Sequence, residues 1–196
     1  MALILPDLKI IYLGPWKTGT TTIGECLKAN QENIIKVRLM HMDVLSVHLP
    51  AKTVREHVGE KVWNSYTKVG SIRNPWDTIV SAFFYIKRKP EHCDLTFREF
   101  VEHAFNWQPR SSSNQLFENG ELVVDKIIRM ESFAKDVLNI FNIDINEKKY
   151  DGIRTMNAGG LRKGTTYRQM FDDDPDLIEL VQLCCKLEIE KFGYVY

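Results

Sequence analysis

The sequence predicts an α/β protein, with one domain over residues 1–196, three α/β/α layers and a mainly parallel central sheet. Three observations support this prediction. Short apolar runs rich in β-branched residues alternate with segments of helical period. The first predicted strand leads through a Gly/Thr loop into a helix, as in P-loop-like proteins. The 196 residues contain no repeat, low-complexity run or linker-like stretch, and this length is typical of one domain.

The predicted elements follow from local patterns. Strands are expected where short apolar runs occur, at residues 9–13, 34–40, 66–72 and 122–130. Helices are expected where capping residues precede an apolar stripe. They cover about 21–29, 49–58, a segment from Asn74-Pro75, a segment opened by the capping box Thr96-x-x-Glu99, 132–141, and a last helix from Asp174-Pro175 to Gly193.

Composition excludes several classes of protein. The chain has 26 basic and 26 acidic residues, so its formal net charge is zero. A balanced charge argues against a nucleic-acid-coating protein and a polybasic membrane binder. The sequence has no signal-peptide pattern, no apolar run of the roughly 18 residues that span a bilayer, and no CxxC pair among its four cysteines. We therefore expect a cytoplasmic protein with reduced thiols, no metal, and neither nucleic acid nor membrane as partner.

The loop after the first strand has the composition of a phosphate-binding loop. Residues 14–22 read Gly-Pro-Trp-Lys-Thr-Gly-Thr-Thr-Thr, and backbone amides at a strand-to-helix turn can bind a phosphate. The Walker pattern fits at Gly14, Gly19 and Thr21, but Thr20 stands where its lysine belongs. The lysine here is Lys17, inside the loop. An exposed Gly/Thr turn is the simpler alternative, and a second motif decides between the two.

The second motif follows the third predicted strand. It reads Ser71-Ile-Arg73-Asn-Pro75-Trp-Asp77-Thr-Ile-Val-Ser81 and places an arginine at the end of the strand. Asp77 and Ser81 are four residues apart and so share one face of the following helix. The apolar stripe of this helix points elsewhere, which leaves the pair available for a ligand.

Together the two motifs resemble the sulfotransferases that use 3′-phosphoadenylyl sulfate (PAPS), and the similarity covers most of the chain. The nearest branch is the one with carbohydrate sulfotransferases and their small bacterial relatives. The resemblance implies that Arg73 and Ser81 bind the donor's 3′-phosphate. It also implies a set of residues for the 5′-phosphosulfate: Lys17, Thr18, Gly19, Thr20, Thr21 and Thr22. Trp16 and Thr78 depart from the family pattern, which usually has Pro and often Arg there.

A third basic cluster lies near the carboxyl end. Arg162-Lys163-Gly164 resembles the late R-K-G element with which cytosolic sulfotransferases cover the 3′-phosphate. The alternative is a flexible basic loop before the last helix. The neutral total charge hides this pattern, because residues 8–24, 61–76 and 152–171 contain nine basic and no acidic residues. These three windows are the ones that carry the candidate donor elements.

The resemblance implies in-line sulfuryl transfer, with catalysis by positioning and charge stabilisation. Lys17 would stabilise the leaving adenosine 3′,5′-bisphosphate, without a metal. His48 is the candidate base, because it matches the family's histidine and has a suitable reference pKa. His41 and Asp43 are the fallback bases, and a surface or helix-capping role is the alternative for His48.

The acceptor is a hydroxyl, or with less support an amine, of a small metabolite or sugar. Acceptor pockets are usually formed by variable loops, and the candidates here are residues 40–50 and 88–115. Two other functions remain open from the sequence. One is a P-loop small-molecule kinase or NTPase, which requires ATP and magnesium. The other is a catalytically silent nucleotide-binding module, which binds the donor without turnover. The sequence leaves the oligomeric state open.

Overall fold

The computed structural model describes residues 1–41, 44–46, 48–107, 113–150, 152 and 162–196. The chain forms two compact units. The first comprises Met1–Ile72 and Ser112–Met156, and the second comprises Arg73–Ser111 and Asn157–Tyr196. The first unit contains every strand that the structure describes, whereas the elements described in the second unit are helical.

The first unit is built on a five-stranded mixed sheet. In spatial order the strands are β3 (Ile35–Val37), β1 (Ala2–Leu5), β2 (Ile10–Leu13), β6 (Thr67–Ile72) and β9 (Lys126–Arg129). The neighbours β2, β6 and β9 are parallel. Strand β1 pairs antiparallel with both β2 and β3, so that β3 runs in the same direction as β2. The expected α/β fold with a mostly parallel sheet is thus confirmed.

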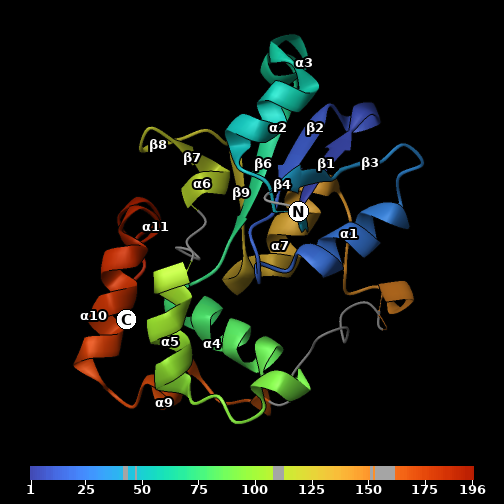
Figure 1. Ribbon diagram of the computed structural model, residues 1–196. Helices are drawn as coiled ribbons and strands as arrows, with labels where there is room; N and C mark the ends of the chain where they lie inside the picture. Colours follow the sequence, from blue (N-terminus) through green and yellow to red (C-terminus); the bar gives the residue numbers. More distant parts are fainter. Residues whose placement is uncertain (42–43, 47, 108–112, 151, 153–161) are drawn as a thin grey trace. The chain divides into compact units, whose positions relative to one another are not determined.

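Helices cover both faces of this sheet (Figure 1). On one face, α1 (Thr20–Lys28) and α7 (Phe133–Phe141) bury Leu27 and Val137 in a core with Tyr12 and Val69. Gly70 alternates with Val69 and so faces the other way, where a Cβ would lie 2.8 Å from Leu116. That opposite face belongs to α2 (Ala51–Val58), α3 (Glu60–Ser65) and α6 (Ser113–Leu116).

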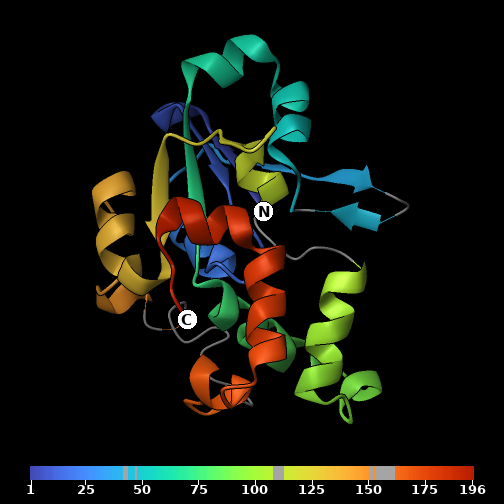
Figure 2. The ribbon, with the colours of Figure 1, turned by 90° about the vertical axis from the view of Figure 1, so that its left-hand side faces the viewer.

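Smaller elements complete the first unit. The hairpin of β4 and β5 extends away from the sheet in Figure 2. A second, two-residue hairpin joins β7 and β8. The remaining bounds are β4 (Leu39–His41), β5 (Val44–Ser46), β7 (Phe117–Glu118) and β8 (Glu121–Leu122), with the short 3-10 helices η1 (Pro6–Leu8), η3 (Met130–Ser132) and η4 (Lys148–Tyr150).

The second unit is a group of helices around an aromatic core. Phe83 packs against Phe97 and Phe100, and Phe97 in turn meets Phe171 edge to face at 5.0 Å. Trp76 donates its indole N–H to the carbonyl of Ile178 over 3.2 Å. The helices are α4 (Pro75–Ile86), α5 (Phe97–Trp107), α9 (Tyr167–Phe171), α10 (Pro175–Cys184) and α11 (Lys186–Phe192), with the 3-10 turn η2 (Pro90–His92).

Helix starts follow the sequence closely in this unit. The Asn74 side chain accepts a hydrogen bond from the backbone N–H of Asp77, as the Asn-Pro pattern predicts. Thr96 and Glu99 form the expected capping box at α5. Asp174 caps α10 by accepting from the N–H groups of Asp176 and Leu177.

Several element predictions are wrong or incomplete. Strand β1 was not predicted, and the strand expected at 34–40 is β3 followed by the separate hairpin strand β4. The strand expected at 122–130 shortens to β9. The last helix divides at Cys185 into α10 and α11, a bend visible in Figure 2. Helices α3 and α9 are additions that the sequence patterns did not indicate.

Candidate functional site

The loop at residues 14–22 is held by a buried chain of hydroxyl groups. Thr18 Oγ1 donates to the carbonyl of Pro15 over 2.7 Å and lies 2.6 Å from Ser71 Oγ. Ser71 Oγ is in turn 2.8 Å from the hydroxyl of Tyr12. Each hydroxyl has one proton, so the chain runs from Tyr12 to Ser71 to Thr18 to Pro15. The side chain of Thr18 therefore fixes the loop to β2 and β6 from inside.

This hydroxyl chain is deeply buried. Ser71 is 0% exposed and Thr18 is 3% exposed. Burial raises the pKa of Tyr12, and the hydrogen bond to Ser71 opposes that shift only in part. The phenol therefore stays protonated and acts as a permanent donor.

The backbone of the loop turns through two left-handed residues, Lys17 with φ 66° and Gly19 with φ 73°. At Gly19 a Cβ would lie 2.6 Å from Met130 Sδ and 2.9 Å from the Phe133 ring, so only glycine fits there. The carbonyl of Gly19 accepts from the N–H of Ile23 and begins α1. The loop thus rests on η3 and α7.

The three threonines after Gly19 form the first turn of α1. Amides in the first turn of a helix have no partner within the helix, and the positive end of the helix dipole favours an anion beside them. Lys17 is half-buried, and its ammonium lies 5.9 Å from the centre of the Trp16 ring. This strand, loop and helix combine the groups that bind a phosphate or sulfate.

His48 lies against the same loop. Its Nδ1 is 2.9 Å from the carbonyl oxygen of Gly14 and 2.6 Å from the backbone nitrogen of Met1. Burial lowers the pKa of His48 to about 4, and the positive charges of the Met1 amino group and Lys36 add to this shift, against the Gly14 bond. The imidazole is therefore neutral at physiological pH. His41 lies in β4, but its side chain and all of Asp43 are outside the described residues.

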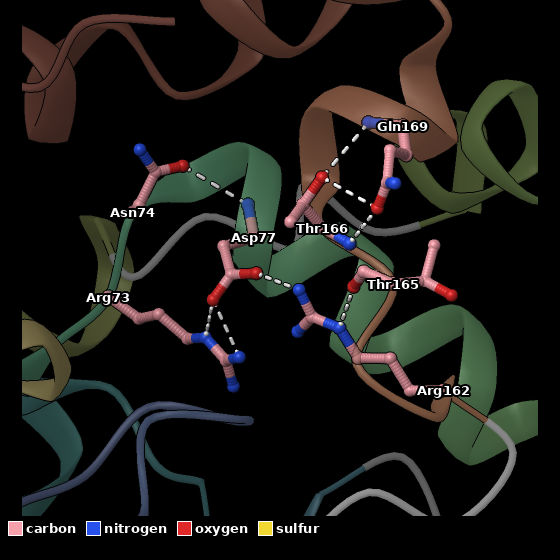
Figure 3. A network of polar contacts seen from close by, with 7 residues as sticks. All are labelled: Arg73, Asn74, Asp77, Arg162, Thr165, Thr166 and Gln169. Atoms are coloured by element: carbon pink, nitrogen blue, oxygen red, sulfur yellow. Dashed lines mark hydrogen bonds and ion pairs between the residues drawn. The ribbon is translucent and has the colours of Figure 1, made fainter.

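The second unit contains a compact ionic network (Figure 3). Asp77 Oδ2 accepts from both Nε and Nη2 of Arg73, each over 2.6 Å. Asp77 Oδ1 accepts from Arg162 Nη2 over 2.5 Å. The three side chains are 17 to 22% exposed, so the network keeps some contact with solvent. Asp77 therefore connects the second and third basic motifs of the sequence.

Arg162 also organises the turn that precedes α9. Its Nε donates to the carbonyl of Thr165 over 2.6 Å, while the N–H of Thr165 donates to the Arg162 carbonyl over 2.8 Å. Lys163 and Gly164 both take positive φ in this turn, and both are exposed. Thr166 and Gln169 then close a capping box that begins α9. The Arg162-Lys163-Gly164 element is thus an ordered turn.

The structure brings some of the predicted site residues together within each unit. Within the first unit it gathers Thr18 to Thr22, Lys17 and His48 around one loop. Within the second it joins Arg73 to Arg162, while Ser81 lies one turn beyond Asp77 in α4. The contact of Asp77 with both arginines is not predicted from the sequence, because no local pattern relates Asp77 to Arg162, which is 85 positions away. The contribution of Tyr12 was missed for the same reason.

Two further findings concern the described residues only. They contain no cluster of three or more His, Cys, Asp or Glu side chains that could hold a metal ion. No helix among them is long and apolar enough to cross a membrane.

The fold places the chain among α/β proteins in which a strand leads through a Gly/Thr loop into a helix. The particular family follows from a comparison with family models, since residues 1–195 match the one described as "Sulfotransferase family". The chain therefore belongs to the sulfotransferase family, and membership implies a PAPS-dependent transferase with a nucleotide donor and an acceptor substrate. This family match spans both compact units.

One curated relative comes from Archaeoglobus fulgidus and is described as an uncharacterized protein. It is 31% identical over 94 residues, which are 47% of this chain and 78% of that protein. No solved structure matches the chain.

Proposed function

We propose that the protein transfers a sulfuryl group from PAPS to a hydroxyl group, or with less support an amine, of a small metabolite or sugar. The observation that carries this proposal is the Arg73–Asp77–Arg162 network, in which one carboxylate orients two arginines from motifs 85 residues apart. Two oriented guanidinium groups suit a phosphate dianion. In this proposal residues 1–196 act as one sulfotransferase domain in the cytoplasm, since all four cysteines are free thiols.

The donor residues divide by function. The loop residues Lys17, Thr18, Gly19, Thr20, Thr21 and Thr22 bind the 5′-phosphosulfate, mainly through backbone amides and hydroxyl groups. Arg73, Ser81 and the Arg162-Lys163-Gly164 turn bind the 3′-phosphate. Support for this division comes from the open first turn of α1 and from the ordered turn at 162–165. We propose a metal-free reaction, in which the ammonium group of Lys17 supplies the positive charge.

The chemical step is an in-line displacement at sulfur. The acceptor oxygen forms a bond to sulfur while the bond between sulfur and the bridging phosphate oxygen breaks. Adenosine 3′,5′-bisphosphate leaves with the electron pair, and Lys17 stabilises the charge on its oxygen. The acceptor proton passes to His48. Burial lowers the pKa of the Met1 amino group beside Nδ1 to about 4, so this amine is neutral at physiological pH. With Nδ1 protonated toward the Gly14 carbonyl, Nε2 has the lone pair that takes the acceptor proton.

Ligand-induced stabilisation tests the donor. Adenosine 3′,5′-bisphosphate at 100 times its dissociation constant should raise the free energy of unfolding by about 2.7 kcal/mol. ATP–magnesium and GTP–magnesium at equal concentration serve as controls. Stabilisation by ATP–magnesium without any by the bisphosphate would show a kinase or NTPase instead. Binding of the bisphosphate with no transfer from PAPS to any acceptor would indicate a silent nucleotide-binding module.

Two substitutions test the division of roles. Arg73→Ala should weaken adenosine 3′,5′-bisphosphate at least tenfold more than adenosine 5′-phosphate, because only the former has a 3′-phosphate. Lys17→Ala should lower turnover by a factor on the order of 100. Lys61→Ala, an exposed lysine in α3, is the matched control. Equal losses of both nucleotides in Arg73→Ala would remove Arg73 from the 3′-phosphate site.

A further inference from the structure

A cavity of about 270 Å³ lies in the first unit, between α1 and the strands β1 and β3. Its walls include Thr20 and Thr21 at the start of α1, Gly24 one turn later, Lys36 on β3, and His48. It therefore brings two loop-end threonines and the candidate base into one space. We name it the α1–β3 cavity.

The charges around this cavity do not balance. Lys28 and Glu25 both line it, and they neutralise each other in an ion pair of 2.5 Å. Lys36 has no ion-pair partner among the residues that the structure describes, and Arg38 is close enough to act on it. Burial, then the charges of Arg38 and Lys28, lower the pKa of Lys36, against the influence of Glu25. A cation in such surroundings gains from an anionic ligand.

Register places Lys36 near the loop. Lys36 is opposite Leu3 in the sheet, and Leu3 is opposite Tyr12, which is two residues before Gly14. His48 binds the Gly14 carbonyl, and the charge of Lys36 contributes to the low pKa of His48. An anion beside Lys36 would offset that charge and make the imidazole a stronger base. The cavity thus has a cation and an imidazole on its wall.

We propose that the α1–β3 cavity binds the acceptor, and that the acceptor is a small hydroxyl-bearing anion whose oxyanion group pairs with Lys36 while its hydroxyl lies beside His48. This inference rests on the proposed sulfuryl transfer and adds the class of acceptor. The volume accommodates a single sugar acid or a hydroxyphenyl acid. In this assignment Lys36 determines specificity, and Gly24 leaves room for the Met1 side chain in the cavity wall.

Matched pairs of acceptors test the proposal. Radiolabelled transfer from PAPS is measured to glucuronate and glucuronamide, and to 4-hydroxyphenylacetate and its amide. The wild-type protein should prefer at least one acid to its amide by about tenfold or more in kcat/KM, as a charge-assisted contact provides. Lys36→Gln should reduce that ratio to near one, and Lys36→Arg should retain it. Lys61→Gln, which alters an exposed lysine of α3, should leave the ratio unchanged.

The outcomes separate this proposal from the one on which it rests. The affinity for adenosine 3′,5′-bisphosphate should be equal in the wild type and Lys36→Gln. If the wild type does not bind the bisphosphate, the proposed function itself is wrong. If it binds the bisphosphate, then transfer to no acid of the panel, equal transfer to acids and amides, or an acid preference that survives Lys36→Gln would each overturn the anionic acceptor.

Discussion

The two units hold their candidate donor residues in place by opposite means. In the first unit the loop at 14–22 is set by neutral groups that are fully buried, with Thr18 and Ser71 at its base. In the second unit the arginines are set by formal charges that remain about one-fifth exposed. Buried hydroxyl groups contribute to folding, whereas partly exposed ion pairs contribute little to it. Substitutions at these residues in the first unit should therefore change stability, and those in the second should change ligand affinity.

The largest effect is expected from the pH dependence of the first unit. The pKa of His48 is about 4 in the folded protein, below its ordinary 6.5. Its contribution to stability is therefore complete above pH 6.5 and is lost as the pH falls toward 4. That loss is about 3 kcal/mol for a shift of this size. Urea unfolding of the wild type and His48→Gln between pH 7.5 and 4 measures it as the difference between two curves. Parallel curves would contradict the buried neutral imidazole.

A smaller loss of stability is expected at Thr18. Thr18→Val removes a donor to the Pro15 carbonyl and leaves Ser71 without its acceptor, so the free energy of unfolding should fall by about 2 kcal/mol. The matched control is Thr21→Val, an exposed position in the first turn of α1, which should change it by less than about 0.5 kcal/mol. Urea denaturation at pH 7.5 compares the two. Equal losses would show that the hydroxyl chain does not stabilise the loop.

A substitution in the ionic network of the second unit should change the affinity for the nucleotide and leave the free energy of unfolding nearly unchanged. Asp77→Asn should weaken adenosine 3′,5′-bisphosphate about tenfold by calorimetry and leave adenosine 5′-phosphate unchanged, because the amide is uncharged and has one acceptor oxygen where the carboxylate holds an arginine on each of two. The free energy of unfolding should change by less than about 1 kcal/mol. Trypsin should also cleave after Arg162 or Lys163 faster than in the wild type.

The control for Asp77→Asn is Glu102→Gln, which breaks an exposed pair with Arg98 in the same unit. It should change neither nucleotide affinity nor cleavage at Arg162. Tighter binding of the bisphosphate by Asp77→Asn would mean that the carboxylate competes with the 3′-phosphate, and would reverse its assigned role. A large loss of stability in Asp77→Asn would remove the contrast between the units.

Local chemistry explains what could be predicted from the sequence. Asn74, Thr96 and Asp174 lie next to the backbone groups that they cap, so their patterns identify the starts of α4, α5 and α10. The Gly/Thr loop was recognised for a similar reason, since its backbone turns depend on residues within it. Glycine at position 19 is required by its own φ as well as by Met130 and Phe133.

Pairing between distant segments explains what could not be predicted. Strand β1 has four buried apolar residues without alternation, and only its antiparallel partners β2 and β3 define it as a strand. Cys185 ends α10 without any glycine or proline to mark the break. The α1–β3 cavity likewise depends on distant segments, because Lys36 and His48 line it together with residues of α1.

The hydroxyl chain of Tyr12, Ser71 and Thr18 links two strands and a loop that are far apart in the chain. Tyr12 donates to Ser71, and Ser71 and Thr18 each accept from one neighbour and donate to the next, so replacing one member alone leaves a partner unsatisfied. Replacing the members together with apolar residues of similar shape avoids that cost. Among related sequences these three positions should therefore covary, and a phenylalanine at position 12 should be accompanied by loss of the hydroxyl at position 71.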